Sequence, residues 1–219
     1  MWWLTVTGWF AKPVGKAFGA VFGTWFKGYV KHRMTLPETI KRTHAMLALM
    51  AELRVLTDAD RVAVFQFHNG GYFSNRNPQW RISCTDEQHA PGVIPAGWDT
   101  QAIFASRMID VVGHLFDGGT PAHACREKIG GRDVYQIDVG TMPNSYAKMI
   151  LANQGVSAFV QIPLYDSEDS IPFGYLALDY CNFGHPNVDP DFAPKLGRIV
   201  EYADKIEFLL VNRKGTLKE

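Results

Sequence analysis

Residues 153–164 read NQGVSAFVQIPL and residues 173–180 read FGYLALDY, and these two apolar runs decide the fold class. Both are rich in β-branched and aromatic residues, which favour strands. The polar segment 166–170, DSEDS, lies between them and is typical of a loop. The pattern predicts a β-hairpin with strands at 157–165 and 173–180.

The remaining elements follow from hydrophobic spacing outward from this hairpin. Helical spacing predicts helices, and runs of Val, Ile and Phe predict further strands. Residues 86–97, rich in Pro and Gly, are expected to form a loop, and Asn69-Gly70-Gly71 is expected to end the first strand. The expected helices are 38–56, 99–116, 143–153 and 189–212, and the other expected strands are 61–68, 79–85 and 132–139. This order predicts an α+β fold in which an antiparallel sheet carries helices on both faces.

A family resemblance rests on the second half of the chain. The run VYQID at 134–138 precedes a short helix that ends in Asn153-Gln154-Gly155-Val156, and two strands then contain Pro163-Leu164 and Gly174-Tyr175-Leu176. This succession resembles a GAF domain, in which Gly-Val precedes a strand ending in Pro-Leu and a hairpin leads to Gly-x-Leu. The resemblance implies a GAF/PAS-like fold over residues 35–213 that binds small molecules or partners and is not an enzyme. Motifs of the cyclic-nucleotide, methionine sulfoxide reductase and bilin-attaching members are not recognised, so the cofactor is unknown.

Strand alternation divides the expected sheet into two faces. An apolar face is expected beneath the helices 38–56 and 189–212, made of Ala63, Phe65, Phe67, Ile82, Cys84, Val160, Ile162, Leu164, Leu176 and Leu178. The opposite face is more polar, and in the GAF family it carries the ligand. Buried polar groups need partners, so this face is the predicted ligand-binding site; the alternative is that its side chains only satisfy loop backbone. The predicted ligand-binding residues are Gln66, His68, Arg81, Ser83, Thr85, Phe159, Gln161, Tyr175 and Asp179.

The first 34 residues differ in charge from the rest of the chain. Residues 1–33 hold five Lys or Arg and no acid, so the remaining residues of this neutral chain carry −5. Helical spacing predicts an amphipathic helix with an aromatic face, a glycine strip and a basic edge. It is expected to lie on a membrane surface, to pack against a partner helix, or to pack on its own domain. The residues assigned to this membrane or partner contact are Trp2, Trp3, Trp9, Gly15, Phe18, Gly19, Phe22, Gly23, Trp25 and Phe26.

Other function classes have weak sequence support. His68-Asn69-Gly70-Gly71 and Cys84 are interpreted as structural, and a lone His123-Ala124-Cys125 lacks a second ligand pair, so neither a catalytic nor a metal site is predicted. Outside the N-terminus, Lys and Arg are not interleaved with aromatic residues. Direct nucleic-acid binding is therefore not expected. Three scattered cysteines and the lack of a long uncharged apolar run favour a cytoplasmic protein, with membrane association left open.

Two hypotheses follow. The first is a non-enzymatic GAF-like sensing or binding module that its N-terminal helix tethers to a membrane surface or a partner. The alternative is a structural scaffold, a homo-oligomer or larger assembly, built through the N-terminal Gly-xxx-Gly helix. Residues 214–219 are expected to be a polar tail.

Overall fold

A computed structural model describes residues 36–72, 78–166, 171–181 and 192–211. The predictions for the N-terminal segment 1–34 and for the tail 214–219 lie outside the described residues. By its internal contacts the chain divides into two units, and Thr43–Val211 is the unit that contains almost all described residues. None of the described helices is long and apolar enough to cross a lipid bilayer.

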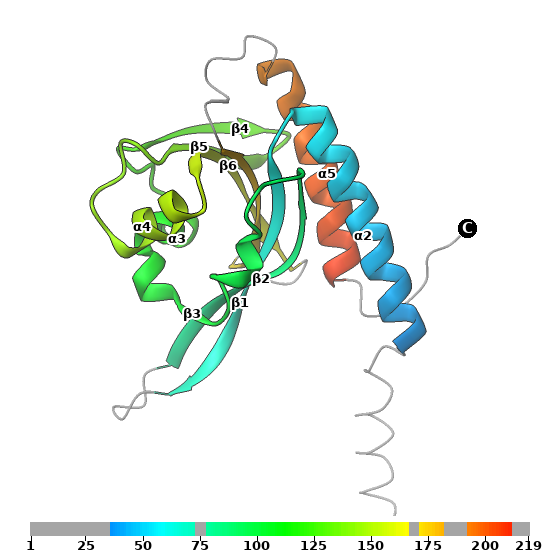
Figure 1. The fold of residues 1–219 in the computed structure, drawn as a ribbon, viewed down its shortest axis with the longest axis horizontal. Coiled ribbons are helices and arrows are strands. Elements are labelled where there is room, and N and C mark those ends of the chain that lie inside the picture. The colour runs from blue at the N-terminus through cyan, green and yellow to red at the C-terminus, as the bar shows by residue number, and fades with distance from the viewer. Residues whose placement is uncertain (1–35, 73–77, 167–170, 182–191, 212–219) are drawn as a thin grey trace, which may run out of the picture. The chain divides into compact units, whose positions relative to one another are not determined.

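Within the described residues, seven antiparallel strands form one sheet in the order β3-β2-β1-β7-β6-β5-β4 (Figure 1). The antiparallel sheet with helices, expected from the sequence, is confirmed. In chain order the elements are α2 (Leu36–Thr57), β1 (Arg61–Tyr72), β2 (Pro78–His89), η1 (Ala96–Trp98), β3 (Ile103–Phe104), η2 (Ala105–Met108), α3 (Ile109–Asp117), β4 (Ala124–Ile129), β5 (Arg132–Asp138), α4 (Tyr146–Asn153), β6 (Val156–Tyr165), β7 (Pro172–Cys181) and α5 (Phe192–Val211).

Two apolar clusters cover the two faces of the sheet. α2 and α5 pack together on one face, which we call the α2/α5 face, and α3 and α4 lie on the other, the α3/α4 face (Figure 1). The cluster on the α2/α5 face combines Met50 and Leu53 of α2 with Ile199 and Ile206 of α5 and with the strands. These four helix residues are completely buried. Burial of this kind is the main stabilising term of a small domain, so each face has its own core.

The hairpin of β6 and β7 lies where its sequence predicts, but the segment 99–116 differs from the prediction. Its first part is the short strand β3 and the 3₁₀ turn η2, and the α-helix begins only at Ile109. Ile103 and Phe104 pair with Ile82 and Arg81, so sheet hydrogen bonding outweighs a helical pattern there. The strand β4 was not predicted, and β2 runs to His89 into the expected loop. Asn69-Gly70-Gly71 does not end β1, which continues to Tyr72.

The predicted faces of β1 and β2 were exchanged. Val62 and Val64 lie in the α2/α5 cluster, whereas Ala63 and Phe65 lie in the α3/α4 cluster, with Phe67 packed against it. Ile82 and Cys84 belong to the α3/α4 cluster as well. The assignment failed because residues 62–65 are all buried, and a strand with two apolar faces gives no alternation from which to choose. For β6 and β7 the predicted apolar face is confirmed, because Val160, Ile162, Leu164, Leu176 and Leu178 all lie in the α2/α5 cluster.

Candidate ligand-binding groove

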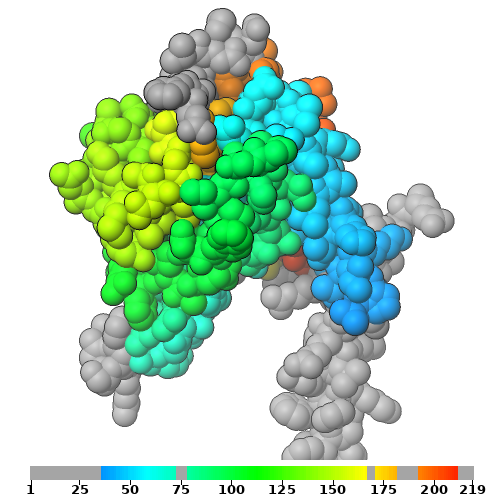
Figure 2. All heavy atoms as spheres, viewed as in Figure 1, coloured from blue at the N-terminus to red at the C-terminus, as the bar shows by residue number. Residues whose placement is uncertain are grey.

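The hairpin of β1 and β2 extends beyond the strand that flanks it. β7 pairs with β1 from Arg61 opposite Asp179 only to Gln66 opposite Gly174. β1 nevertheless continues to Tyr72, paired with β2 alone. In Figure 1 this part of the hairpin projects past the other strands, and Figure 2 shows its cyan-green atoms below the green atoms of the segment that leads into α3. A two-stranded ribbon leaves both of its faces short of neighbours, so a groove can form beside it.

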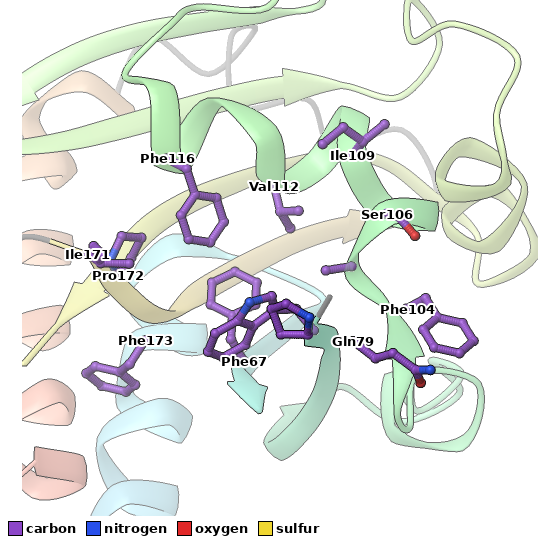
Figure 3. A pocket seen from close by; sticks show the side chains of 13 residues that line it. Phe67, Gln79, Phe104, Ser106, Ile109, Val112, Phe116, Ile171, Pro172 and Phe173 are labelled. Atoms are coloured by element: carbon purple, nitrogen blue, oxygen red, sulfur yellow. The ribbon is translucent and has the colours of Figure 1, made fainter. Parts of the chain in front are cut away.

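A groove of about 660 Å³ lies on the α3/α4 side of this ribbon (Figure 3). One wall comes from the ribbon, the second from β3, η2 and α3, and the third from the start of β7. Its lining residues are Phe67, Pro78, Gln79, Trp80, Phe104, Ala105, Ser106, Ile109, Val112, Phe116, Ile171, Pro172 and Phe173. No charged side chain is among them, so the groove is apolar, with polar side-chain groups only from Gln79, Ser106 and the Trp80 indole.

Contacts between aromatic rings connect the groove to the core. The ring centroid of Phe67 lies 5.2 Å from that of Phe116 and 6.2 Å from that of Tyr175. Tyr175 in turn stacks on Phe65 at 4.8 Å. These separations are typical of favourable aromatic pairs. They fix Phe67 and Phe116 in place, so the groove has one side held by the folded core.

The rim of the groove exposes large apolar side chains. Trp80 is 53% exposed, Ile109 58%, Phe116 54% and Ile171 63%. Single exposed apolar residues are common, but a group of them around one concavity marks a binding site more often than chance.

The space between the sheet and the helices α3 and α4 is filled by protein. Only about 20 Å³ remains there, which is enough for one water molecule and too small for a cofactor. The residues around it include Phe159 and Tyr175 of the sheet, Val111 of α3 and Leu151 of α4, all buried. Any ligand of cofactor size must therefore bind elsewhere in this conformation.

A buried ion pair lies at the edge of this filled space. Arg61 Nη2 and Asp179 Oδ2 are 2.6 Å apart, and both side chains are almost fully shielded from solvent. Arg61 also donates to the carbonyl of Ile94 at 2.6 Å and to Gln154 Oε1 at 2.9 Å. Burial raises the pKa of Asp179, and the Arg61 guanidinium opposes that shift. The pair joins β1, β7, the C-cap of α4 at Gln154 and the loop at residue 94.

Gln161 is bonded within the protein on the same face. Its Oε1 accepts from His114 Nε2 at 2.8 Å, and its Nε2 donates to the carbonyl of Val111 at 3.1 Å. Gln161 is completely buried and His114 almost so. Burial lowers the pKa of His114, and the hydrogen bond to Gln161 opposes that shift. The two residues fasten α3 to β6.

Comparison with solved structures finds GAF domains of cyanobacterial photoreceptors. The chain is 16% identical to the blue-light-absorbing form of the PixJ GAF domain of Thermosynechococcus elongatus, with a TM-score of 0.53 over 81% of this chain and 92% of that chain. It is 15% identical to the phycoerythrobilin-bound GAF domain of a cyanobacterial phytochrome, with a TM-score of 0.50 over 81% of this chain and 89% of that chain. The chain has a GAF-like fold. No family model matches the sequence, and none of the curated proteins is similar to it. The resemblance stated from the sequence is confirmed, and at this identity it extends to the fold alone.

The predicted ligand-binding residues do not line one cavity of this GAF-like fold. Gln66, His68, Arg81 and Ser83 follow the alternation of Val62 and Val64, so they lie on the opposite side of the ribbon from Phe67, and His68 Nε2 meets Ser83 Oγ at 2.9 Å. Thr85 lies at a bulge, where its hydroxyl donates to the carbonyl of Val64 at 3.4 Å. The remaining four, Phe159, Gln161, Tyr175 and Asp179, share the α3/α4 face and are buried. The prediction of one polar cavity was therefore wrong, because the face assignment of β1 and β2 was wrong and because Gln161 and Asp179 find partners inside the fold.

None of the groove residues was among the ligand-binding residues predicted from the sequence. Helical spacing over residues 99–116 selects Ile103, Met108, Val111, Val112 and Leu115 as the apolar positions of the expected helix and leaves Ile109 and Phe116 unassigned. Those two side chains lie at the groove. The available signal was a surplus of apolar residues on a short helix, more than one face needs for core contact.

Proposed function

We propose that this chain is a non-enzymatic binding module and that its ligand is a small, largely apolar molecule with one or more rings. The observation that carries the proposal is the groove of about 660 Å³. Its volume falls within the range of about 300–1,000 Å³ that is usual for small-molecule sites, which are also concave and mostly apolar. Aromatic walls from separate parts of the chain favour a flat ring system over a flexible aliphatic chain.

The chemistry of the lining favours binding over catalysis. Every lining residue is described; Ser106 is the only potential nucleophile among them, and no Asp, Glu, His, Cys, Lys, Arg or Tyr accompanies it as a base or acid. General acid–base and nucleophilic catalysis both require such groups within reach of the substrate. The GAF-like fold adds support, since a GAF domain of this fold from a cyanobacterial phytochrome binds phycoerythrobilin.

Filling the groove should weaken ligand binding. Ala105 lines the groove and is half-buried, so Ala105→Trp places an indole in it. The neutral fluorophore N-phenyl-1-naphthylamine, whose emission rises in apolar surroundings, serves as the probe. We expect the wild-type chain to bind it and Ala105→Trp to weaken binding at least about tenfold, because about 1.4 kcal/mol of lost apolar contact is tenfold in affinity.

A matched control is Ala193→Trp, an exposed position on α5. It makes the same substitution away from the groove and should leave the affinity unchanged. Lack of binding by the wild-type chain, or equal binding by both variants, would count against the groove as a ligand site. Thermal unfolding of each variant checks that it is folded.

We also propose that residues 1–34, which lie outside the described residues, tether the module to a membrane surface or a partner. Full-length protein should float with vesicles containing anionic phosphatidylserine, and replacing Lys12, Lys16, Lys27 and Lys31 with Gln should abolish flotation, since each basic residue near such a surface contributes about 1 kcal/mol.

The alternative of a structural scaffold predicts a different result. Exposed Trp80, Ile109, Phe116 and Ile171 favour it, because such patches also mark protein contacts. Under this alternative the protein does not bind vesicles and sediments as an oligomer. Gly19→Leu in the glycine strip should then lower the mass of the sedimenting assembly. A monomer that also fails to float would exclude both the membrane tether and the homo-oligomer.

A further inference from the structure

A buried histidine fastens the helix α3 to the sheet through one of its two ring nitrogens. His114 is only 4% exposed, and its Nε2 donates to Oε1 of the completely buried Gln161 at 2.8 Å. Its Nδ1 is also buried and has no hydrogen-bond partner among the described residues. Since the Gln161 oxygen can only accept, Nε2 carries the proton of the neutral ring and Nδ1 carries a lone pair. A second proton, on Nδ1, would therefore be a buried donor without an acceptor.

The surroundings of His114 disfavour a positive charge on its ring. The charged and titratable groups that face it are Asp117 at the end of α3, His123 before β4, Arg126 on β4 and Tyr135 on β5, whose ring centroid lies 4.4 Å from that of His114. Burial is the largest effect and lowers the pKa of His114. His123 and Arg126 lower this pKa further, whereas Asp117 raises it. The folded domain therefore holds this ring neutral at a pH at which an exposed histidine is already charged.

The helix that carries His114 also forms one wall of the groove. Ile109, Val112 and Phe116 of α3 line the groove, and Figure 3 shows Val112 and Phe116 pointing from α3 into it. α3 has nine residues, and an isolated helix of that length is not stable in water. Its position therefore depends on its contacts with the sheet, and the bond from His114 to Gln161 is one of them.

We infer that His114 makes the groove sensitive to acid: when its ring takes up a second proton, α3 separates from β6 and the groove loses its α3 wall. The inference rests on the proposed function and adds the regulation of the same site. A ligand binds while the ring is neutral and is released when the ring is charged. The physical reason is that water can solvate the charged ring, whereas the folded site offers Nδ1 no acceptor among the described residues.

The lowered pKa sets the direction of the pH dependence. An unperturbed histidine has a pKa of about 6.5, and His114 in the folded domain has a lower one. Below about pH 6.5 the unfolded chain takes up this proton before the folded domain does. The contribution of His114 to stability is therefore complete above that pH and is lost as the pH falls toward the folded-state pKa. In this window one such group raises the unfolding equilibrium constant by up to about tenfold per pH unit.

His114→Gln tests the proton on this ring, because the Nε2 of a glutamine can still donate to Gln161 but the amide does not titrate. Urea unfolding is measured between about pH 8 and pH 5, a range that spans the ordinary pKa of histidine. From about pH 6.5 to pH 5 we expect the unfolding constant of the wild type to rise at least about threefold more than that of His114→Gln. The matched control His44→Gln, at an exposed position of α2, should keep the pH dependence of the wild type.

Binding of N-phenyl-1-naphthylamine, which stays uncharged over this range, measures the effect on the groove. Its affinity for the wild type should fall at least about threefold from about pH 6.5 to pH 5, because the affinity is reduced by the fraction of molecules that lack the α3 wall. The affinity of His114→Gln should change less than about twofold over the same range. The His44→Gln control should follow the wild type.

The outcomes separate this inference from the proposed function. If the wild type fails to bind the fluorophore at about pH 8, where His114 is neutral, the proposed function and this inference both fail. If it binds there, but the unfolding constants or the affinities of wild type and His114→Gln change equally with pH, only this inference is overturned. The NMR signal of the His114 Cε1 proton in the wild type gives a test that needs no variant. It should remain that of a neutral ring at about pH 6.5, and titration at the ordinary pKa of histidine would also overturn the inference.

Discussion

Asp179→Ala is expected to lower the free energy of unfolding by about 3–5 kcal/mol, which is the usual cost of leaving a buried charge without its partner. Arg61 is fully shielded, and Asp179 supplies the only carboxylate that it contacts among the described residues. An arginine cannot lose its proton in a protein, so the charge stays in the core. Urea unfolding followed by circular dichroism measures the loss.

The reverse substitution is expected to be milder. In Arg61→Met the remaining Asp179 is also buried, but burial already raises its pKa, so this carboxyl group can take up a proton and become neutral. The double variant Arg61→Met/Asp179→Leu should show the smallest decrease in the free energy of unfolding, because an apolar pair avoids the desolvation cost of both ions. If Asp179→Ala is no less stable than the double variant, the ion pair is not what holds this edge of the domain.

The hairpin of β6 and β7 could be predicted from its sequence because one face of it is continuously apolar. Val160, Ile162, Leu176 and Leu178 are fully buried in the α2/α5 cluster, and the alternation assigns them correctly. Local patterns of this kind also located α2, α4 and α5 to within a few residues. These elements share a strong period and short-range stop signals.

β1 and β3 show where such patterns fail. In β1, residues 62–65 are buried on both sides, so no period distinguishes the faces and an error there reversed the whole strand. β3 is only two residues long and depends on its pairing with β2, a contact with residues some twenty positions away. Tertiary contacts determine both the orientation of β1 and the presence of β3, and a single sequence does not show such contacts.

The groove escaped prediction for the same reason. Phe67, Trp80, Ile109 and Ile171 come from four separate parts of the chain. Each of them by itself is typical of a core residue, and only the projection of the β1–β2 ribbon past β7 leaves them at a surface. The predicted polar site failed in the opposite way, because Gln161 found its partners in His114 and in the backbone of Val111. Polarity on a sheet face therefore indicated internal hydrogen bonds here, and the apolar surplus indicated the candidate site.

Gly174→Ala is expected to destabilise the domain by about 3 kcal/mol, at the upper end of the range for overpacking. A Cβ at this position would lie 2.2 Å from the backbone oxygen of Phe65 and 3.2 Å from the Cα of Gln66. No real Cβ tolerates such a contact, and a backbone atom cannot rotate away as a side chain can. Gly174 pairs with Gln66 at the last rung between β7 and β1, so β7 must separate from β1 at the place where the groove begins. We therefore expect probe binding to weaken together with stability.

Gly197→Ala is the matched control, because the same methyl group there meets nothing within 4 Å. Gly197 lies inside α5 and is exposed, where alanine is the better helix former by about 1 kcal/mol. This variant should gain stability by roughly 0.5–1 kcal/mol and bind the neutral fluorophore as the wild type does. If β7 approaches β1 as closely as the structure has it, urea unfolding should show a lower free energy of unfolding than wild type for Gly174→Ala and a higher one for Gly197→Ala. A Gly174→Ala protein as stable as the wild type would mean that the two strands are further apart. The start of β7, which is the third wall of the groove, would then lie elsewhere, and the groove would not have the shape described.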